Sequence, residues 1–273
     1  MCGDGELRTE PIPERVLTRR RLFLAAAAGA VMTGGVAAAE GGFDQLRGDG
    51  LATARKRAER LATPDRRRWE AHRIGTSVEG RPIVAHRTVR PDSRKSVLVV
   101  AAVHGDERGV APVGVELTTV PIPTGIDAWI VPVANPDGWA RGSRNNARDV
   151  DLNRNFPWWW TRADGGPTPA SEPETQALMT LVEQLRPTVT VWIHQPYEYV
   201  SAVDPSVEHL ARAWAGAAGL AYEPPIAQHG GGETWTYKTM RLPSILVEGT
   251  TRDTSADETS AHRRGFEALL AAL

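Results

Sequence analysis

The chain has 273 residues, of which 41% are hydrophobic and 24% charged, a balance typical of a globular protein with a substantial buried core. Its 32 basic and 33 acidic residues give a net charge of −1, which excludes the strongly basic surface of a nucleic-acid-binding domain. The sequence contains a single cysteine, Cys2, so no intramolecular disulfide can form.

Residues 1–39 have the composition of an export signal. Three arginines, Arg19 to Arg21, precede an apolar stretch rich in alanine and glycine that ends at Ala37 to Ala39. Adjacent arginines followed by x-Phe-Leu are typical of a twin-arginine signal peptide, and the small residues offer a cleavage site before Glu40. An uncleaved anchor is the alternative, although the glycines weaken the stretch as a membrane span. We therefore predict an exported protein.

Cleavage before Glu40 would remove five basic and four acidic residues, leaving 27 basic and 29 acidic residues. It would also remove Cys2, so the exported protein would have no thiol. We expect a monomer with no nucleic-acid partner and no stable membrane span after cleavage. Segment 40–66 is predicted to be an N-terminal helix or linker, and residues 67–273 a single domain.

The hydrophobic pattern of this domain alternates strands with helices. Residues 75–80 are rich in turn formers and join the first two predicted strands into a hairpin. Ser171 and Glu174 have the spacing of a capping box at the start of a helix. Such alternation implies an α/β layer fold. Strands are predicted over residues 69–74, 81–89, 96–103, 128–133, 188–193 and 243–247, and helices over 109–120, 171–184, 207–218 and 260–273.

Three of the apolar strands end in ionisable side chains. These are His104 with Glu107, then His194, then Glu248. If the three strands are parallel neighbours, all four side chains meet at the carboxyl edge of the sheet. A histidine or glutamate after one strand is more often structural, but the joint occurrence favours a site. Two histidines and one carboxylate suit zinc with its fourth position open, and Glu248 would remain for proton transfer. Asp106 could compete with Glu107 for the metal.

The segment between these strands carries further motifs, namely N-P-D-G at 135–138, R-N at 144–145 and V-D-L-N-R-N-F-P at 150–157. With H-G-D-E at 104–107 and the later His and Glu in the same order, these motifs resemble the zinc metallocarboxypeptidase family typified by carboxypeptidase A. The similarity runs from Trp69 to the C-terminus. Within the family, the short H-G-D-E loop and the D-L-N-R-N-F-P string most resemble the murein peptide amidases of bacteria.

The resemblance implies a three-layer α/β/α fold with a mixed, mostly parallel central sheet. It makes His104, Glu107 and His194 the ligands of one Zn²⁺ ion, with Asp106 a loop residue. It makes Glu248 the general base. Asp151 would brace a ligand histidine or a turn.

The resemblance also implies a substrate-binding side of the site. Arg144, with Arg141 as the runner-up, would stabilise the developing oxyanion. Asn153 and Arg154 would bind the terminal carboxylate of the substrate, because a guanidinium offers a bidentate fork. A structural salt bridge is the alternative role for Arg154.

Two further positions concern specificity. Glu233 precedes Trp235 by two residues, which is the spacing of the family's specificity position. A carboxylate there would favour a substrate amine, such as the free amino group of diaminopimelate; a solvent-exposed loop glutamate is the alternative. The family's pocket tyrosine aligns near Ile226, so its role is vacant or is taken by another tyrosine: Tyr197, Tyr222 or Tyr237.

Two loop features depart from the family or concern the pocket. Asp149 replaces the glycine that commonly precedes V-D-L-N-R-N, which puts the local turn in doubt. Gly230 to Gly232 predict a mobile loop beside the pocket.

The resemblance therefore implies a secreted zinc peptidase or amidase that hydrolyses a peptide bond near a free carboxylate, with a peptide or muropeptide as the substrate. A deacylase of the aspartoacylase or succinylglutamate desuccinylase type is one rival, but those enzymes generally lack the D-L-N-R-N-F-P string. A non-catalytic cell-wall peptide-binding module is the other. Such a module would be expected to have lost at least one ligand or Glu248.

Overall fold

A computed structural model describes residues 69–88, 93–225, 227–251 and 255–273 of the chain. The predicted export signal over residues 1–39 and the segment 40–66 lie outside these residues. Among the helices that the structure describes, none has the length and apolar character needed to cross a membrane.

The described residues form an eight-stranded sheet with the order β1-β2-β4-β3-β5-β8-β6-β7. Strands β4, β3, β5 and β8 run parallel, as do β6 and β7, whereas β2 is antiparallel to β1 and β4, and β6 is antiparallel to β8. This is the mixed, mostly parallel sheet that was expected. The strand bounds are β1 Trp69–Thr76, β2 Pro82–Thr88, β3 Lys95–Ala101, β4 Ile126–Val131, β5 Val189–His194, β6 Tyr199–Ala202, β7 Ala221–Tyr222 and β8 Ser244–Glu248.

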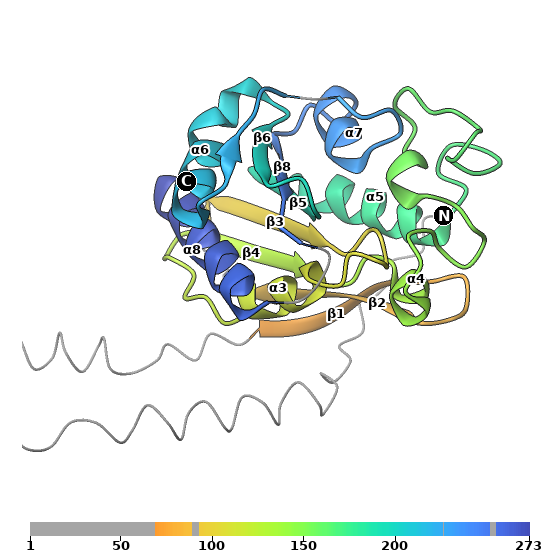
Figure 1. The fold of residues 1–273 in the computed structure, drawn as a ribbon, viewed down its shortest axis with the longest axis horizontal. Helices are drawn as coiled ribbons and strands as arrows, with labels where there is room; N and C mark the ends of the chain where they lie inside the picture. The colour runs from red at the N-terminus through yellow and green to blue at the C-terminus, as the bar shows by residue number, and fades with distance from the viewer. Residues whose placement is uncertain (1–68, 89–92, 226, 252–254) are drawn as a thin grey trace, which may run out of the picture. The chain divides into compact units, whose positions relative to one another are not determined.

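Helices cover both faces of the sheet, which gives three layers (Figure 1). Helices α3 (Val110–Leu117), α6 (Glu208–Ala218) and α8 (Ala256–Ala272) share a hydrophobic core with one face. Helices α5 (Pro173–Leu185) and α7 (Gly232–Lys238) share a second core with the other face. Shorter helices lie in the connections, namely α4 (Pro136–Arg141), η1 (Leu152–Arg154) and η2 (Pro205–Val207).

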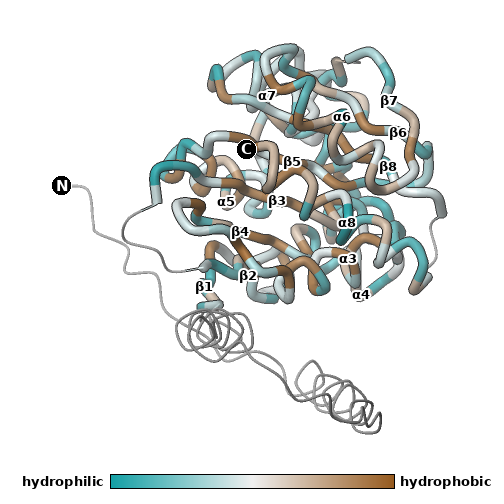
Figure 2. Tube along the Cα trace, turned by 90° about the vertical axis from the view of Figure 1, so that its left-hand side faces the viewer, coloured by the Kyte–Doolittle hydropathy of each residue, from teal (hydrophilic) through white to brown (hydrophobic). Residues whose placement is uncertain are grey.

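Strand β3 shows why the sheet sits at the centre. Its side chains alternate between the two cores, with Val97 and Val99 in one and Leu98 and Val100 in the other. All four are fully buried, and Figure 2 shows hydrophobic residues concentrated along the central strands. A strand buried on both faces reads as a continuous apolar run, which is what the sequence displays here.

The predicted capping box at α5 is wrong. The helix begins at Pro173, and its N-cap, Glu172, makes no side-chain capping bond. The hydroxyl of Ser171 donates instead to the carboxylate of Glu172 at 2.7 Å. The carboxylate of Glu174 accepts from the backbone N–H of Val78 at 3.1 Å, so it serves a tertiary contact with the hairpin.

The last helix begins earlier than predicted. Helix α8 starts at Ala256 because the hydroxyl of Ser255 accepts a hydrogen bond from the backbone N–H of Glu258 at 2.9 Å, a typical N-cap. Strands β6 and β7 and helices α4 and α7 were not predicted. Helix α4 begins inside the N-P-D-G motif, where Asn135 supplies the cap and Pro136 occupies the first turn.

Candidate active site

The carboxyl ends of three neighbouring strands bring the predicted site residues together. Strand β5 lies between β3 and β8, and all three are parallel. His194 ends β5 and Glu248 ends β8, and these two residues are register partners. His104 and Glu107 lie in the loop that follows β3. The three strands are therefore parallel neighbours, which is the condition for the four side chains to meet.

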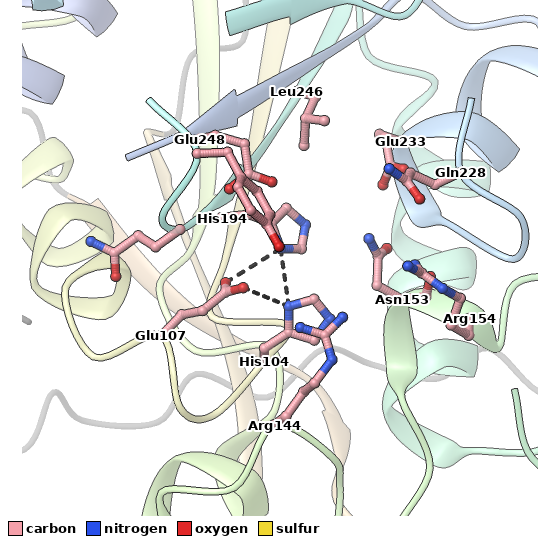
Figure 3. A pocket seen from close by; sticks show the side chains of 12 residues that line it. His104, Glu107, Arg144, Asn153, Arg154, His194, Gln228, Glu233, Leu246 and Glu248 are labelled. Carbon is pink, nitrogen blue, oxygen red and sulfur yellow. Dashed lines mark hydrogen bonds and ion pairs between the residues drawn. The ribbon is translucent and has the colours of Figure 1, made fainter. Parts of the chain in front are cut away.

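His104, Glu107 and His194 form a cluster of buried metal-binding side chains (Figure 3). Nδ1 of His104 lies 2.7 Å from Oε1 of Glu107 and 3.3 Å from Nδ1 of His194. Nδ1 of His194 lies 3.3 Å from Oε2 of Glu107. One ligand atom from each residue falls within 4.8 Å of the other two.

The cluster fits a zinc ion. Tetrahedral ligands at bond lengths of about 2.0–2.2 Å lie roughly 3.4 Å apart, which is close to two of the three separations. Oε2 of Glu107 is buried and contacts Nδ1 of His194 at 3.3 Å without forming a well-aligned hydrogen bond, so a bound cation would satisfy it. Asp106, the competing carboxylate, is not part of the cluster and does not line the pocket.

Charge pairing within the cluster shifts the protonation of its members. Burial alone lowers the pKa of His104, but the charge of Glu107 and a hydrogen bond with Asp151 raise that pKa to about 9. Burial raises the pKa of Glu107, but the two histidines hold it at about 2. Because only a neutral imidazole binds a metal, His104 would have to lose a proton before it could hold a metal ion at neutral pH.

Asp151 supports both the cluster and Arg144. Its Oδ1 lies 3.1 Å from Nε2 of His104 and accepts the backbone N–H of Asn153 at 2.9 Å. Its Oδ2 accepts from Nε of Arg144 at 3.0 Å and lies 2.9 Å from Nη2. Despite burial, these partners hold the pKa of Asp151 well below its ordinary value. This geometry agrees with the expectation that Asp151 braces a ligand histidine.

Two backbone positions explain how the loops of the site fit together. Gly105 approaches α4 so closely that a Cβ atom would collide with the backbone of Gly138. Asp149, where the family commonly has glycine, adopts the left-handed conformation with a φ of 61°. Its carboxylate accepts a hydrogen bond from Asn145 at 2.9 Å. The turn therefore forms without the glycine.

The two arginines considered for the oxyanion role lie in different places. Arg144 lines the pocket, and its guanidinium is oriented by Asp151. Arg141 instead forms an ion pair with Glu79, in the connection between β1 and β2. The geometry therefore favours Arg144 over Arg141.

Four polar side chains form the side of the pocket opposite the cluster in Figure 3: Asn153, Arg154, Gln228 and Glu233. Oδ1 of Asn153 accepts the backbone N–H of Gly232 at 2.8 Å, which links η1 to α7. Nη1 of Arg154 donates to the carbonyl of Asn153 at 2.8 Å. Nε of Arg154 lies 3.7 Å from Oδ2 of Asp164, too far for a hydrogen bond, so this ion pair does not tie the guanidinium to Asp164.

Glu233 is fully buried, so the alternative of a solvent-exposed loop glutamate is wrong. It lies in the first turn of α7 and lines the pocket. Its Oε1 accepts from the hydroxyl of Thr234 at 3.3 Å, while Oε2 has no hydrogen-bond partner. A buried carboxylate oxygen without a partner is costly, and a cationic ligand group would satisfy it.

The prediction of a mobile glycine loop beside the pocket does not match the packing. Gly230, Gly231 and Gly232 are all buried. The N–H of Gly230 donates to the carbonyl of Trp158 at 2.9 Å, and its own carbonyl accepts the N–H of Phe156 at 3.0 Å. Gly232 is the first residue of α7.

Glu248 is buried, and one of its two carboxylate oxygens has no hydrogen-bond partner. Burial raises the pKa of its carboxyl to about 7, against the opposing charge of His194. Its Oε2 has no hydrogen-bond partner, and Figure 3 shows the side chain beside His194 on the pocket wall. A carboxylate that titrates near neutral pH at this place is suited to accept and return a proton.

Among the three candidate tyrosines, Tyr197 lines the pocket and is 68% exposed. Cζ of Arg212 lies 3.9 Å from the ring centroid of Tyr222, and Nζ of Lys238 lies over the ring of Tyr237, so both rings already have a cationic partner. Ile226 lies outside the described residues. The geometry therefore favours Tyr197 for the vacant role.

Three lining residues were missed from the sequence: Gln195, Gln228 and Leu246. Gln195 follows His194 directly, and Leu246 precedes Glu248 by two residues and so shares its face of β8. The sequence positions of Gln195 and Leu246 could therefore have indicated both residues. Gln228 lies in a loop, where no periodic pattern points to it.

A sequence model of the family described as zinc carboxypeptidase matches residues 56–203, a range that contains all three residues of the metal-binding cluster. Murein peptide amidase A from Escherichia coli K12 is 34% identical over 203 residues, which cover 67% of this chain and 79% of that protein. The protein of the same name from Vibrio campbellii is 32% identical over 223 residues, covering 72% and 85%.

Solved structures of similar proteins share the fold of this chain. The chain is similar to the murein-tripeptide amidase MpaA from Escherichia coli O157, with a TM-score of 0.59 and 26% identity over 73% of this chain and 90% of that one. It shares its fold with the carboxypeptidase A of Helicoverpa armigera, with a TM-score of 0.61 and 19% identity over 98% and 83%.

Proposed function

Because this chain belongs to the zinc carboxypeptidase family and is a hydrolase similar to the murein peptide amidases, we propose that it hydrolyses a peptide bond of murein peptides next to a free carboxylate. The observation that carries the proposal is the arrangement of the pocket. A buried zinc-binding cluster and a carboxylate base lie on one side, and a carboxylate-binding pair with a buried glutamate lies on the other. A substrate held between them has its scissile bond at the cluster.

The metal site consists of His104, Glu107 and His194. Zinc bound by these three residues would retain an open position and supply a water activated at neutral pH. Oε2 of Glu248 would accept a proton from the attacking water and return it to the leaving amine. Arg144, held by Asp151, stabilises the negative charge that develops on the carbonyl oxygen.

Substrate orientation falls to the opposite side of the pocket. Asn153 and Arg154 bind the carboxylate next to the scissile bond, and the permanent charge of the guanidinium suits this task. Glu233 binds a substrate ammonium group, which matches the free amine of diaminopimelate in a γ-glutamyl-diaminopimelate linkage. Its buried, unpartnered Oε2 supports this assignment.

A comparison of two defined peptides tests the proposal. The first is the murein tripeptide alanyl-γ-glutamyl-diaminopimelate, and the second is a tripeptide of ordinary α-linkages that ends in alanine. We expect the zinc-loaded protein to release diaminopimelate from the first with the higher kcat/KM. Faster cleavage of the second would instead assign a general carboxypeptidase.

Export belongs to the same proposal. The twin-arginine pattern at Arg20 and Arg21 would deliver the protein to the compartment that contains murein peptides. The single cysteine lies in the predicted leader, so the mature enzyme would need no disulfide chemistry after export.

A further inference from the structure

A chain of hydrogen bonds behind the metal-binding cluster links three loops that each carry a site residue. Gln195, which follows His194, is buried, and its Oε1 accepts the backbone N–H of Gly109 at 3.0 Å. Gly109 lies two residues after Glu107. Nε2 of Gln195 donates to Oε1 of Glu258 on α8 at 3.0 Å. The side chain of Gln195 therefore connects the loop after β3 to the last helix.

Glu258 extends this chain to the third loop. Its Oε1 accepts the backbone N–H of Thr250 at 2.7 Å, and Thr250 lies two residues after Glu248. Nε2 of His262, one turn along α8, lies 3.7 Å from the same oxygen. Burial raises the pKa of Glu258, but the nearby imidazole of His262 and the hydrogen bonds from Gln195 and Thr250 hold that pKa below its ordinary value. The carboxylate is thus an ionised acceptor.

Gly249 packs closely against this connection. A Cβ atom on Gly249 would collide with Oε1 of Glu258 and would lie 3.1 Å from Cγ of Gln195. The backbone of Gly249 also donates to the carbonyl of His194 at 2.8 Å. Helix α8 is itself anchored in the core, since Trp214 of α6 packs against both His262 and Phe266.

The chemistry of the connection requires an amide at position 195. Gly109 presents a donor and Glu258 an acceptor, so the residue between them must accept on one side and donate on the other. Glutamine does both, whereas a glutamate would face a second buried carboxylate. Neither Gln195 nor Glu258 belongs to the metal-binding cluster, but Gln195 holds Gly109, two residues after Glu107, and Glu258 holds Thr250, two residues after Glu248.

We propose that Gln195 and Glu258 are positioning residues that hold the loops of Glu107 and Glu248 in the geometry at which the site binds zinc and the base reaches its water. The proposal rests on the zinc site of the proposed function and is independent of the substrate. Outer partners of metal ligands typically contribute about 10–100-fold in metal affinity or activity.

Zinc affinity of the purified full chain, measured by competition with a chromophoric chelator, tests the proposal without a substrate. We expect Gln195→Met, which keeps the shape but loses both hydrogen bonds, to weaken zinc binding by at least about tenfold. Glu258→Gln keeps an acceptor at Oε1 and should retain near-wild-type affinity, whereas Glu258→Met should not. Matched controls are Gln176→Met and Glu267→Gln, which alter exposed side chains on α5 and α8.

Kinetics provide the second measurement. Gln195→Met should lower kcat by about 10–100-fold with KM near wild type, because the carboxylate-binding side of the pocket is not part of the connection. Wild-type zinc affinity and kcat in a folded Gln195→Met protein would overturn the proposal. If that variant does not fold, equal zinc affinities in Glu258→Gln and Glu258→Met would overturn it. A weakened zinc affinity without any hydrolysis of murein peptides would leave it standing and refute the proposed function instead.

Discussion

Oδ1 of Asp151 lies 3.1 Å from Nε2 of His104, on the side of the imidazole ring away from the metal-binding cluster. A carboxylate in this position fixes the ring orientation and favours the tautomer whose other nitrogen faces the metal. The same carboxylate holds the guanidinium of Arg144. One buried residue therefore supports both a predicted ligand and the predicted oxyanion residue.

Replacement of this carboxylate should affect both functions. We expect Asp151→Asn to lower zinc affinity or kcat by about 10–100-fold, because the imidazole and guanidinium lose their charged partner. Chelator competition and steady-state kinetics measure the two effects. Asp149→Asn, at an exposed position two residues away, is the matched control. Equal behaviour of the two variants would show that Asp151 is dispensable.

Removal of the base should separate chemistry from metal binding. We expect Glu248→Gln to lower kcat by at least about 10²–10⁴-fold while retaining one zinc ion per chain, because the amide cannot accept a proton. Elemental analysis and a turnover assay measure both properties. Full activity in this variant would refute the assigned base.

The raised pKa of His104 predicts how pH affects the protein before zinc is added. The pKa of His104 rises from an ordinary value of 6.5 to about 9 in the folded protein. The protonated imidazole therefore stabilises the folded state fully below pH 6.5, and this contribution to the free energy of unfolding is lost as the pH rises toward 9. We expect the Tm of the zinc-free protein to fall across this window. Binding of zinc at pH 7.5 should release about one proton, measurable by calorimetry in buffers of different ionisation enthalpy. A zinc-binding enthalpy that does not depend on the buffer would contradict this assignment.

Glu233 should determine the preference for a substrate amine. We expect Glu233→Ala to reduce kcat/KM for a diaminopimelate or lysine substrate by about 10–100-fold relative to a neutral analogue, since a buried charged hydrogen bond is lost. Glu223→Ala, at an exposed position, is the control. If the preference between basic and neutral substrates is unchanged, the carboxylate does not contact the substrate.

The predicted export signal can be tested separately. Replacement of Arg20 and Arg21 by lysine should leave the protein in the cytoplasm, because the twin-arginine pair is the feature that the export machinery recognises. Fractionation of cells that produce each form measures the effect. Unchanged export of the lysine variant would rule out this route.

Much of the fold was accessible from the sequence because the central strands are buried on both faces. The apolar runs before His104, His194 and Glu248 are long enough to identify, and their parallel order follows from the helices between them. Strand β7 has two residues, too few for any pattern, and strand β6 has four. Helix α4 was missed because N-P-D-G also reads as a turn.

The functional residues of the site were predictable from the sequence, but the hydrogen bonds that hold their loops in place were not. The ligand histidines and Glu248 stand out at strand ends, and Glu233 is marked by its distance from Trp235. The hydrogen bond between Gln195 and Glu258 joins residues 63 positions apart, and nothing in the local sequence of either residue indicates it. Contacts of this kind depend on how α8 packs against the sheet.

Digestion of purified muropeptides tests the central claim most directly. The products are identified by mass spectrometry with the zinc-loaded protein, with a chelator, and with zinc restored after chelation. We predict that diaminopimelate-containing fragments appear with zinc, disappear with the chelator and return when zinc is restored. Intact muropeptides after incubation with a folded protein that contains one zinc ion per chain would contradict the account.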